Sequence, residues 1–235
     1  MKINRRHTGR TAVVLAAGSG TRLGAGSNKV WLPLAGRELA TWSFQWLAQT
    51  ELFDRYVVAV QPHEREEVRQ ILMRHIDVPV DIIDGGASRH GSEIRVLEYL
   101  APSIESGDCE LVLIHDGARP LASPTLIAEV VKAAEEFGGA LPYLETSTLT
   151  GLDYEGTLIR VQTPQVFQAP ALLDAYRKSA AAGFEGSDTA MCMEEFRPDI
   201  QVKCVLGSAQ NLKVTYPQDL IMAEHILASH HYRLR

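Results

Sequence analysis

Residues 11–29 read TAVVLAAGSGTRLGAGSNK, where a short apolar run passes directly into a glycine-rich turn that carries Arg22 and Lys29. The apolar run is rich in β-branched residues, which is typical of a buried strand. A glycine-rich loop after a strand lets backbone N–H groups approach a phosphate closely. This stretch therefore predicts an α/β fold with an anion site just beyond its first strand.

The same alternation of apolar runs and helical patterns continues along the chain. Strands are predicted at 11–16, 55–61, 80–84, 111–116, 139–144 and 201–207. Helices are predicted at 38–49, 63–75, 91–100, 124–137, 170–182 and 188–195, with a last helix from Pro217. Continuous apolar strands separated by amphipathic helices indicate a doubly wound, mostly parallel sheet. We expect a single domain over 1–235, with a polar, turn-rich, arm-like insertion at about 145–162.

Composition excludes several classes of protein. The formal net charge of -6 argues against binding to a nucleic-acid backbone, since such proteins usually carry a basic surplus. The sequence has no apolar window of about 18 residues, so we expect no membrane partner. Its three cysteines, Cys109, Cys192 and Cys204, have neither metal-site nor disulfide spacing. With no signal-peptide pattern at the N-terminus, the expected location is the cytoplasm.

The glycine loop by itself allows several functions. Gly18, Gly20 and Gly24 miss the dinucleotide fingerprint by one residue, and the following predicted strand ends at Gln61 rather than at a ribose-binding acid. The Walker pattern is absent. An NAD(P)-dependent oxidoreductase is thus disfavoured but stays open, as do an inert nucleotide sensor and a structural turn with solvated cations.

Five motifs in order resemble one family. The loop, in which Lys29 comes seven residues after Arg22, is followed by GGASRHGS (85–92), HDGARP (115–120), QTPQVF (162–167) and NLKVTYPQDL (211–220). Together they resemble the 2-C-methyl-D-erythritol 4-phosphate cytidylyltransferase family. The resemblance implies a Rossmann-like nucleotidyltransferase fold, a homodimer formed through the arm, and Mg²⁺ or another divalent cation as cofactor. The implied reaction joins CTP to a polyol phosphate, giving CDP-methylerythritol and pyrophosphate in the non-mevalonate route to isoprenoid precursors. The alternative acceptor is another polyol phosphate, such as ribitol 5-phosphate.

The resemblance also assigns site residues. The implied catalytic cations are Arg22, Lys29 and Lys213, with Lys213 on a short strand. The implied nucleotide-binding residues are Ala16, Ala17, Gly18, Gly20, Gly86 and Ser92. The implied acceptor-binding residues are Asp116, Arg119 and Thr146, and Asp116 is also the implied metal ligand. Arg89 would support the base-binding loop, QTPQVF would shape the pocket wall, and Ser92 is alternatively a simple helix N-cap.

Departures from the family pattern lie mainly on the acceptor side. Glu145 replaces an aspartate, and the arm is several residues shorter than in the family. The arginine expected before QTPQVF falls near Glu155, while Arg160 is the only arginine close by. Asn28 stands where a proline is usual. The acceptor is therefore less firmly implied than CTP.

Overall fold

A single mixed sheet organises the chain. The computed structural model describes residues 8–18, 28–145 and 159–229. The strand order is β10-β7-β9-β6-β1-β4-β5, with β8 paired to β7. The strands are β1 (Arg10–Leu15), β4 (Arg55–Val60), β5 (Val80–Asp84), β6 (Leu111–Asp116), β7 (Gly138–Glu145), β8 (Ile159–Val161), β9 (Gln165–Gln168) and β10 (Gln201–Leu206). A separate two-stranded hairpin joins β2 (Pro33–Leu34) to β3 (Arg37–Glu38).

The parallel half of the sheet contains β6, β1, β4 and β5, as the β-branched runs predict. The sequence predicts no strand between 139–144 and 201–207, and in this respect the prediction is wrong. Instead β9 lies antiparallel between β6 and β7. Its central residues Val166 and Phe167 are buried, so β9 joins the two halves of the sheet into one core.

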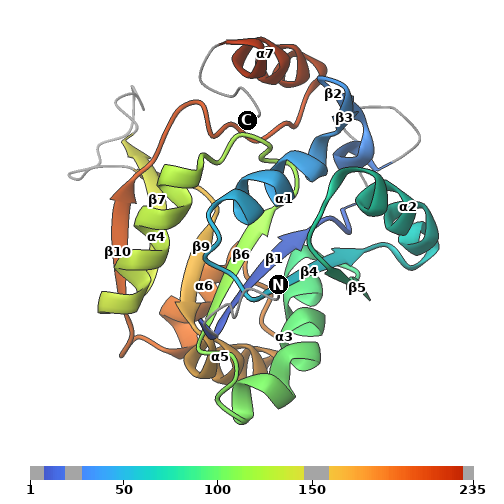
Figure 1. The fold of residues 1–235 in the computed structure, drawn as a ribbon. Helices are drawn as coiled ribbons and strands as arrows, with labels where there is room; N and C mark the ends of the chain where they lie inside the picture. The colour runs from blue at the N-terminus through green and yellow to red at the C-terminus, as the bar shows by residue number, and fades with distance from the viewer. Residues whose placement is uncertain (1–7, 19–27, 146–158, 230–235) are drawn as a thin grey trace, which may run out of the picture.

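Helices cover both faces of the sheet. They are α1 (Leu39–Gln49), α2 (Arg65–His75), α3 (Arg89–Glu105), α4 (Pro124–Phe137), α5 (Ala169–Ala182), α6 (Thr189–Phe196) and α7 (Pro217–Ala228), with short 3-10 turns η2 (Lys29–Trp31) and η3 (Pro62–Glu64). Alternate residues of β1 point to opposite faces: Ala12 and Val14 pack in the core under α1, α2 and α4, while Val13 and Leu15 pack in the core under α3, α5 and α6. The predicted doubly wound α/β fold is confirmed (Figure 1).

The expected helices and strands agree with the structure to within a few residues, except that α3 is longer than its predicted 91–100 at both ends and that no strand forms at Lys213. Most of the predicted arm, including Thr146 and Glu155, lies outside the described residues. Its return is seen as β8, which pairs antiparallel with the end of β7. The single domain stays a prediction.

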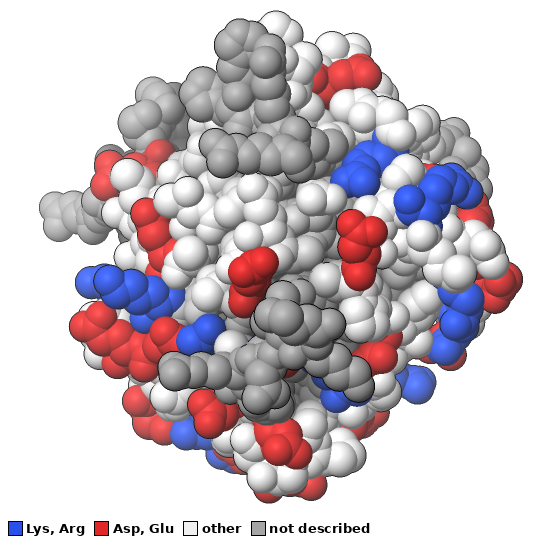
Figure 2. Space-filling view, in the orientation of Figure 1, with Lys and Arg blue, Asp and Glu red and all other residues white. Residues whose placement is uncertain are grey.

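The described surface carries charges of both signs. On the face in Figure 2, Lys and Arg side chains are interspersed with Asp and Glu rather than gathered into a basic stripe. No described helix is long and apolar enough to cross a lipid bilayer.

Candidate active site

The candidate site lies at the carboxyl ends of the parallel strands. From β1 the chain winds through α1 to β4 on one side, and α3 then returns it to β6 on the other side of β1. The strand order therefore reverses between β1 and β6, and such a switch point opens a crevice where α/β proteins bind ligands. The first glycine loop follows β1 here, and Asp116 ends β6.

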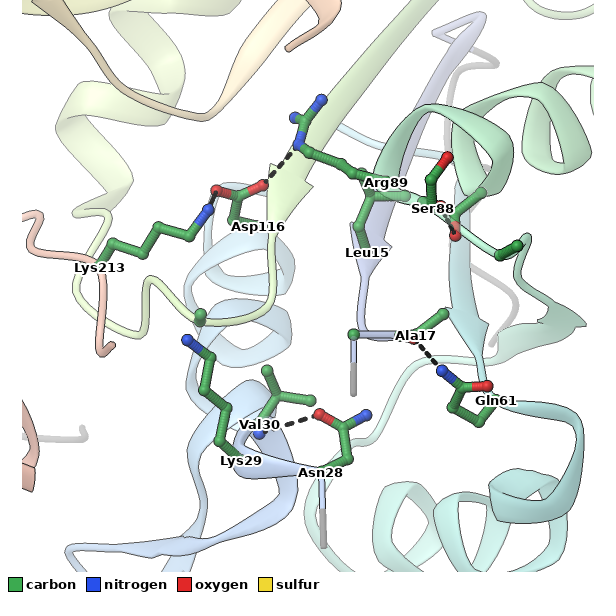
Figure 3. A pocket seen from close by; sticks show the side chains of 14 residues that line it. Leu15, Ala17, Asn28, Lys29, Val30, Gln61, Ser88, Arg89, Asp116 and Lys213 are labelled. Carbon is green, nitrogen blue, oxygen red and sulfur yellow. Dashed lines mark hydrogen bonds and ion pairs between the residues drawn. The ribbon is translucent and has the colours of Figure 1, made fainter. Parts of the chain in front are cut away.

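A cavity of about 420 Å³ occupies this position (Figure 3). Its described lining residues are Leu15, Ala17, Gly18, Asn28, Lys29, Val30, Gln61, Ala87, Ser88, Arg89, Ser92, Asp116, Ala118 and Lys213. They come from the ends of β1, β4 and β6, the start of α3, η2 and the segment before α7. Asp116 is the only carboxylate among these lining residues, whereas three of them are cations. The cavity is thus suited to a polyanion.

Asp116 is the centre of an ion cluster. Its Oδ2 lies 2.7 Å from Lys213 Nζ and 3.8 Å from Arg119 Nε, and its Oδ1 lies 3.3 Å from Arg89 Nε. Burial would raise the pKa of Asp116, but Arg89 and Lys213, with Arg119, outweigh it and hold that pKa far below its ordinary value. Asp116 is therefore an anion at any physiological pH, and it fixes three cations around one edge of the cavity.

A buried hydrogen-bond chain fixes the end of β6. His115 Nε2 lies 2.9 Å from the Arg119 carbonyl, which can only accept, so Nε2 carries the proton. The Thr163 hydroxyl then donates to His115 Nδ1 at 3.2 Å and accepts from the Asp116 N–H at 3.0 Å. Burial lowers the pKa of His115 to about 4, which keeps the ring neutral. The ring thus positions Asp116 and Arg119, as expected of a residue with no catalytic proton.

Lys213 reaches the cavity from a segment held by buried amides. Asn211, which is fully buried, donates to the Thr163 carbonyl at 2.9 Å, and Gln162 donates to the Asn211 carbonyl at 3.1 Å. Arg119 Nη1 donates to the same carbonyl at 2.8 Å. The QTPQVF motif therefore holds the Lys213 segment in place, in addition to its expected role of shaping the pocket wall. The expected short strand at Lys213 is wrong, because these side-chain contacts replace a strand ladder there.

The side chains of Asn28 and Gln61 hold the described ends of the glycine loop, although the family pattern assigns neither of them to the site. Asn28 Nδ2 donates to the Ala16 carbonyl at 2.6 Å and to Glu64 Oε2 at 3.1 Å. Gln61 donates to the Ala17 carbonyl. The Ala16 N–H donates to the Ala59 carbonyl at 2.8 Å, so both main-chain groups of Ala16 bond within the fold. Asn28 does what a proline cannot, because proline has no side-chain donor.

The turn between β5 and α3 supplies the opposite wall. Ser88 caps α3, its side chain accepting from the Gly91 N–H at 2.9 Å, so the alternative of Ser92 as N-cap is wrong. Ser92 Oγ accepts from the Gly86 N–H at 3.0 Å and donates to the Ser88 carbonyl at 2.8 Å. A Cβ on Gly86 would meet the Gly91 backbone at 2.3 Å, so this turn needs glycine. Ser92 keeps one acceptor lone pair for a ligand.

The expected site residues divide into three groups. The cavity is lined by Ala17, Gly18, Lys29, Ser92, Asp116 and Lys213. Ala16, Gly86 and Arg119 lie behind this lining and hold it through the bonds just described. Gly20, Arg22 and Thr146 lie outside the described residues. The sequence does not predict the contact of Arg89 with Asp116, because the two residues lie 27 positions apart and belong to different motifs.

A divalent cation would have one protein carboxylate here. No group of three metal-ligating side chains occurs among the described residues. Mg²⁺ commonly takes only one or two carboxylates and completes its shell with substrate phosphates and water. Asp116, facing a cavity suited to a polyanion, fits that pattern.

Among the described residues, cations from distant segments and one carboxylate meet at a switch point beside the first strand, an arrangement that suits a nucleotidyltransferase. The sequence model of the family described as 2-C-methyl-D-erythritol 4-phosphate cytidylyltransferase matches residues 11–229. The chain belongs to this family, and the predicted fold, family and enzyme class are confirmed: it is a CTP-dependent cytidylyltransferase of isoprenoid synthesis.

Individual relatives agree with this membership. The 2-C-methyl-D-erythritol 4-phosphate cytidylyltransferase of Geobacillus kaustophilus is 38% identical over 93% of this chain and 96% of its own length. The crystal structure of the Thermus thermophilus enzyme of that name has a TM-score of 0.67 at 29% identity, covering 91% of this chain and 96% of its own. A 4-diphosphocytidyl-2C-methyl-D-erythritol synthase from Anaerococcus prevotii shares the fold with a TM-score of 0.79 at 24% identity, and the match covers 93% of this chain and 95% of that one.

Proposed function

We propose that the cavity holds the triphosphate of CTP between Lys29 and Lys213 while 2-C-methyl-D-erythritol 4-phosphate attacks its α-phosphorus. The observation that carries this proposal is the approach of the two lysines to one cavity from segments far apart in sequence, opposite the β1 loop. Both lysines are assigned to the α-phosphate. Arg22 is assigned to the outgoing pyrophosphate, as the family resemblance implies.

The nucleotide is assigned to the walls of the same cavity. Main-chain groups of Ala17, Gly18 and Gly20 would follow the triphosphate and ribose. The remaining lone pair of Ser92 suits the exocyclic amino group of cytosine, which is a donor where uracil has an acceptor. This wall therefore supports a preference for CTP.

The reaction needs no general base. An acceptor phosphate oxygen, already anionic at pH 7, forms the new bond to the α-phosphorus as the bond to pyrophosphate breaks. The charge gathers on the α-phosphate oxygens and on the leaving group, where preorganised cations stabilise it most effectively. The protein's contribution is alignment and charge, which agrees with a neutral, inward-bonded His115.

The cofactor is proposed to be Mg²⁺ or another divalent cation, with Asp116 as its protein ligand. When bound, such an ion neutralises triphosphate charge. On the acceptor side, Arg119 and Thr146 are assigned to the acceptor phosphate, and the arm is assigned to a homodimer. The enzyme is expected to act in the cytoplasm, with no nucleic-acid partner.

The proposal is tested by pyrophosphate release from CTP with Mg²⁺. Methylerythritol phosphate is compared with ribitol 5-phosphate and a panel of sugar 1-phosphates, and CTP with UTP. We expect release with methylerythritol phosphate and CTP, abolished by a chelator. Faster release with ribitol 5-phosphate would reassign the acceptor, and no release with any acceptor would refute the assignment of the site.

A further inference from the structure

Glu93 lies beneath the cavity, one helical turn into α3 from Arg89. Its side chain is fully buried, and it is absent from the cavity lining. Its Oε1 accepts from Arg89 Nη1 at 2.8 Å and from the Thr189 hydroxyl at 2.5 Å. The mechanism above gives this carboxylate no part.

Arg89 connects this buried carboxylate to the one in the site. While Nη1 donates to Glu93, Nε donates to Asp116 Oδ1 at 3.3 Å (Figure 3 shows the second bond). The planar guanidinium can hold two carboxylates at a fixed separation, which an ammonium on a flexible stem cannot do. Glu93 therefore limits how far Arg89 can move into the cavity.

A merely structural role accounts poorly for this arrangement. A buried ion pair is often no more stabilising than apolar side chains of similar volume. Thr189 alone would need only a neutral acceptor. Burial disfavours the charged carboxylate and so raises the pKa of Glu93, and Arg89 is the cation that opposes this effect.

We propose that Glu93 is a positioning residue, which holds Arg89 and through it Asp116 in the geometry that receives the triphosphate. The inference rests on the proposed function, because it concerns the same site. Glu93→Gln keeps the shape of the side chain and removes its charge. Held less firmly, Arg89 should reorient and disturb Asp116 and Lys213.

The electrostatic field of the Glu93 carboxylate and its positioning of Arg89 have opposite effects on the affinity for CTP. Glu93→Gln makes the region under the cavity more positive, so a pure field effect would tighten the binding of an anionic triphosphate. Positioning predicts the reverse. We expect the Kd of CTP, measured by calorimetry without acceptor, to rise about tenfold, and kcat/KM to fall about 10- to 100-fold.

The matched control is Thr189→Val, which removes the other bond to the same oxygen and leaves the Arg89 pair intact. It should lower the melting temperature while keeping the Kd of CTP within about twofold of the unaltered chain. In an Arg89→Ala background, Glu93→Gln should have no further effect on kcat/KM, because coupled residues are not additive. If Glu93→Gln does not fold, Arg89→Lys carries the test and should weaken CTP binding in the same way.

The inference is overturned if Glu93→Gln binds CTP as well as or better than the unaltered chain. It is also overturned if Thr189→Val weakens CTP binding as much as Glu93→Gln does. Additive effects in the Arg89→Ala background would also overturn it, as would an unaltered Kd in Arg89→Lys. Failure of the proposed function looks different, because the unaltered chain itself would then neither bind CTP nor release pyrophosphate.

Discussion

Lys213 Nζ lies 2.7 Å from Asp116 Oδ2, although 97 residues separate the two in sequence. The lysine assigned to the α-phosphate is thus held by a carboxylate before any substrate anion arrives. An incoming triphosphate has to share Lys213 with Asp116 or take it away, leaving Asp116 with Arg89. Asp116 therefore sets the position of the cations, and under the proposed function it would become available to a metal ion as the phosphates enter.

Asp116→Asn tests the two roles assigned to this carboxylate, positioning the cations and binding a metal ion. The amide keeps the shape but loses the charge, so we expect triphosphate affinity to be retained or increased while kcat falls at least about 100-fold. The Mg²⁺ concentration for half-maximal activity should rise. Unfolding by urea should show a loss of about 3–5 kcal/mol, since three cations lose their buried partner. A variant with the unaltered magnesium dependence would exclude Asp116 as the metal ligand.

Lys29→Ala tests the second lysine. As a preorganised charge at the transition state, Lys29 should contribute about two to three orders of magnitude to kcat. Steady-state kinetics with CTP measure this directly. Lys132→Ala, on the exposed face of α4, is the matched control and should leave kcat and KM unchanged. A change in KM alone would show that Lys29 only binds substrate.

The sequence predicts the parallel half of the sheet well, because β1, β4 and β6 are continuous β-branched or aliphatic runs buried on both faces. It does not predict β9. That strand has four residues, follows a proline, and gains its stability from pairing with two strands far away in the chain. Short runs of this kind carry little periodicity of their own.

The site shows the same division. Motif resemblance finds residues that line the cavity, such as Lys29 and Asp116. It does not find Asn28, Glu93 or Asn211, whose roles depend on contacts across 12 to 96 residues of sequence. The hydrogen-bond partners of a buried polar residue come together only in the folded chain, and no local sequence pattern predicts them.

Asn211→Ala tests the support of Lys213. The change leaves the Thr163 carbonyl without its donor, which should destabilise the fold by about 1–3 kcal/mol. Because the Lys213 segment would shift, we also expect kcat/KM to fall about tenfold or more. The exposed neighbour Gln210→Ala is the control for urea unfolding and kinetics. A loss of stability with unaltered kcat/KM would show that Lys213 is positioned by other contacts.

His115 should make the stability of the protein depend on pH. Its pKa is about 4 in the folded chain, because burial disfavours the charged ring, and about 6.5 in the unfolded chain. As the pH falls from 6.5 to 4, the unfolded chain gains a proton that the folded chain lacks, so the free energy of unfolding should decrease by roughly 3 kcal/mol.

His115→Asn separates this contribution from those of the other histidines. The amide oxygen, which takes the place of Nδ1, can still accept from Thr163, and the amide does not titrate; the shorter side chain no longer reaches the Arg119 carbonyl. Urea midpoints measured between pH 7 and pH 4 should therefore fall less steeply in the variant than in the unaltered chain. Parallel curves would show that His115 keeps an ordinary pKa, and that the hydrogen-bond chain to Asp116 tolerates a charged ring.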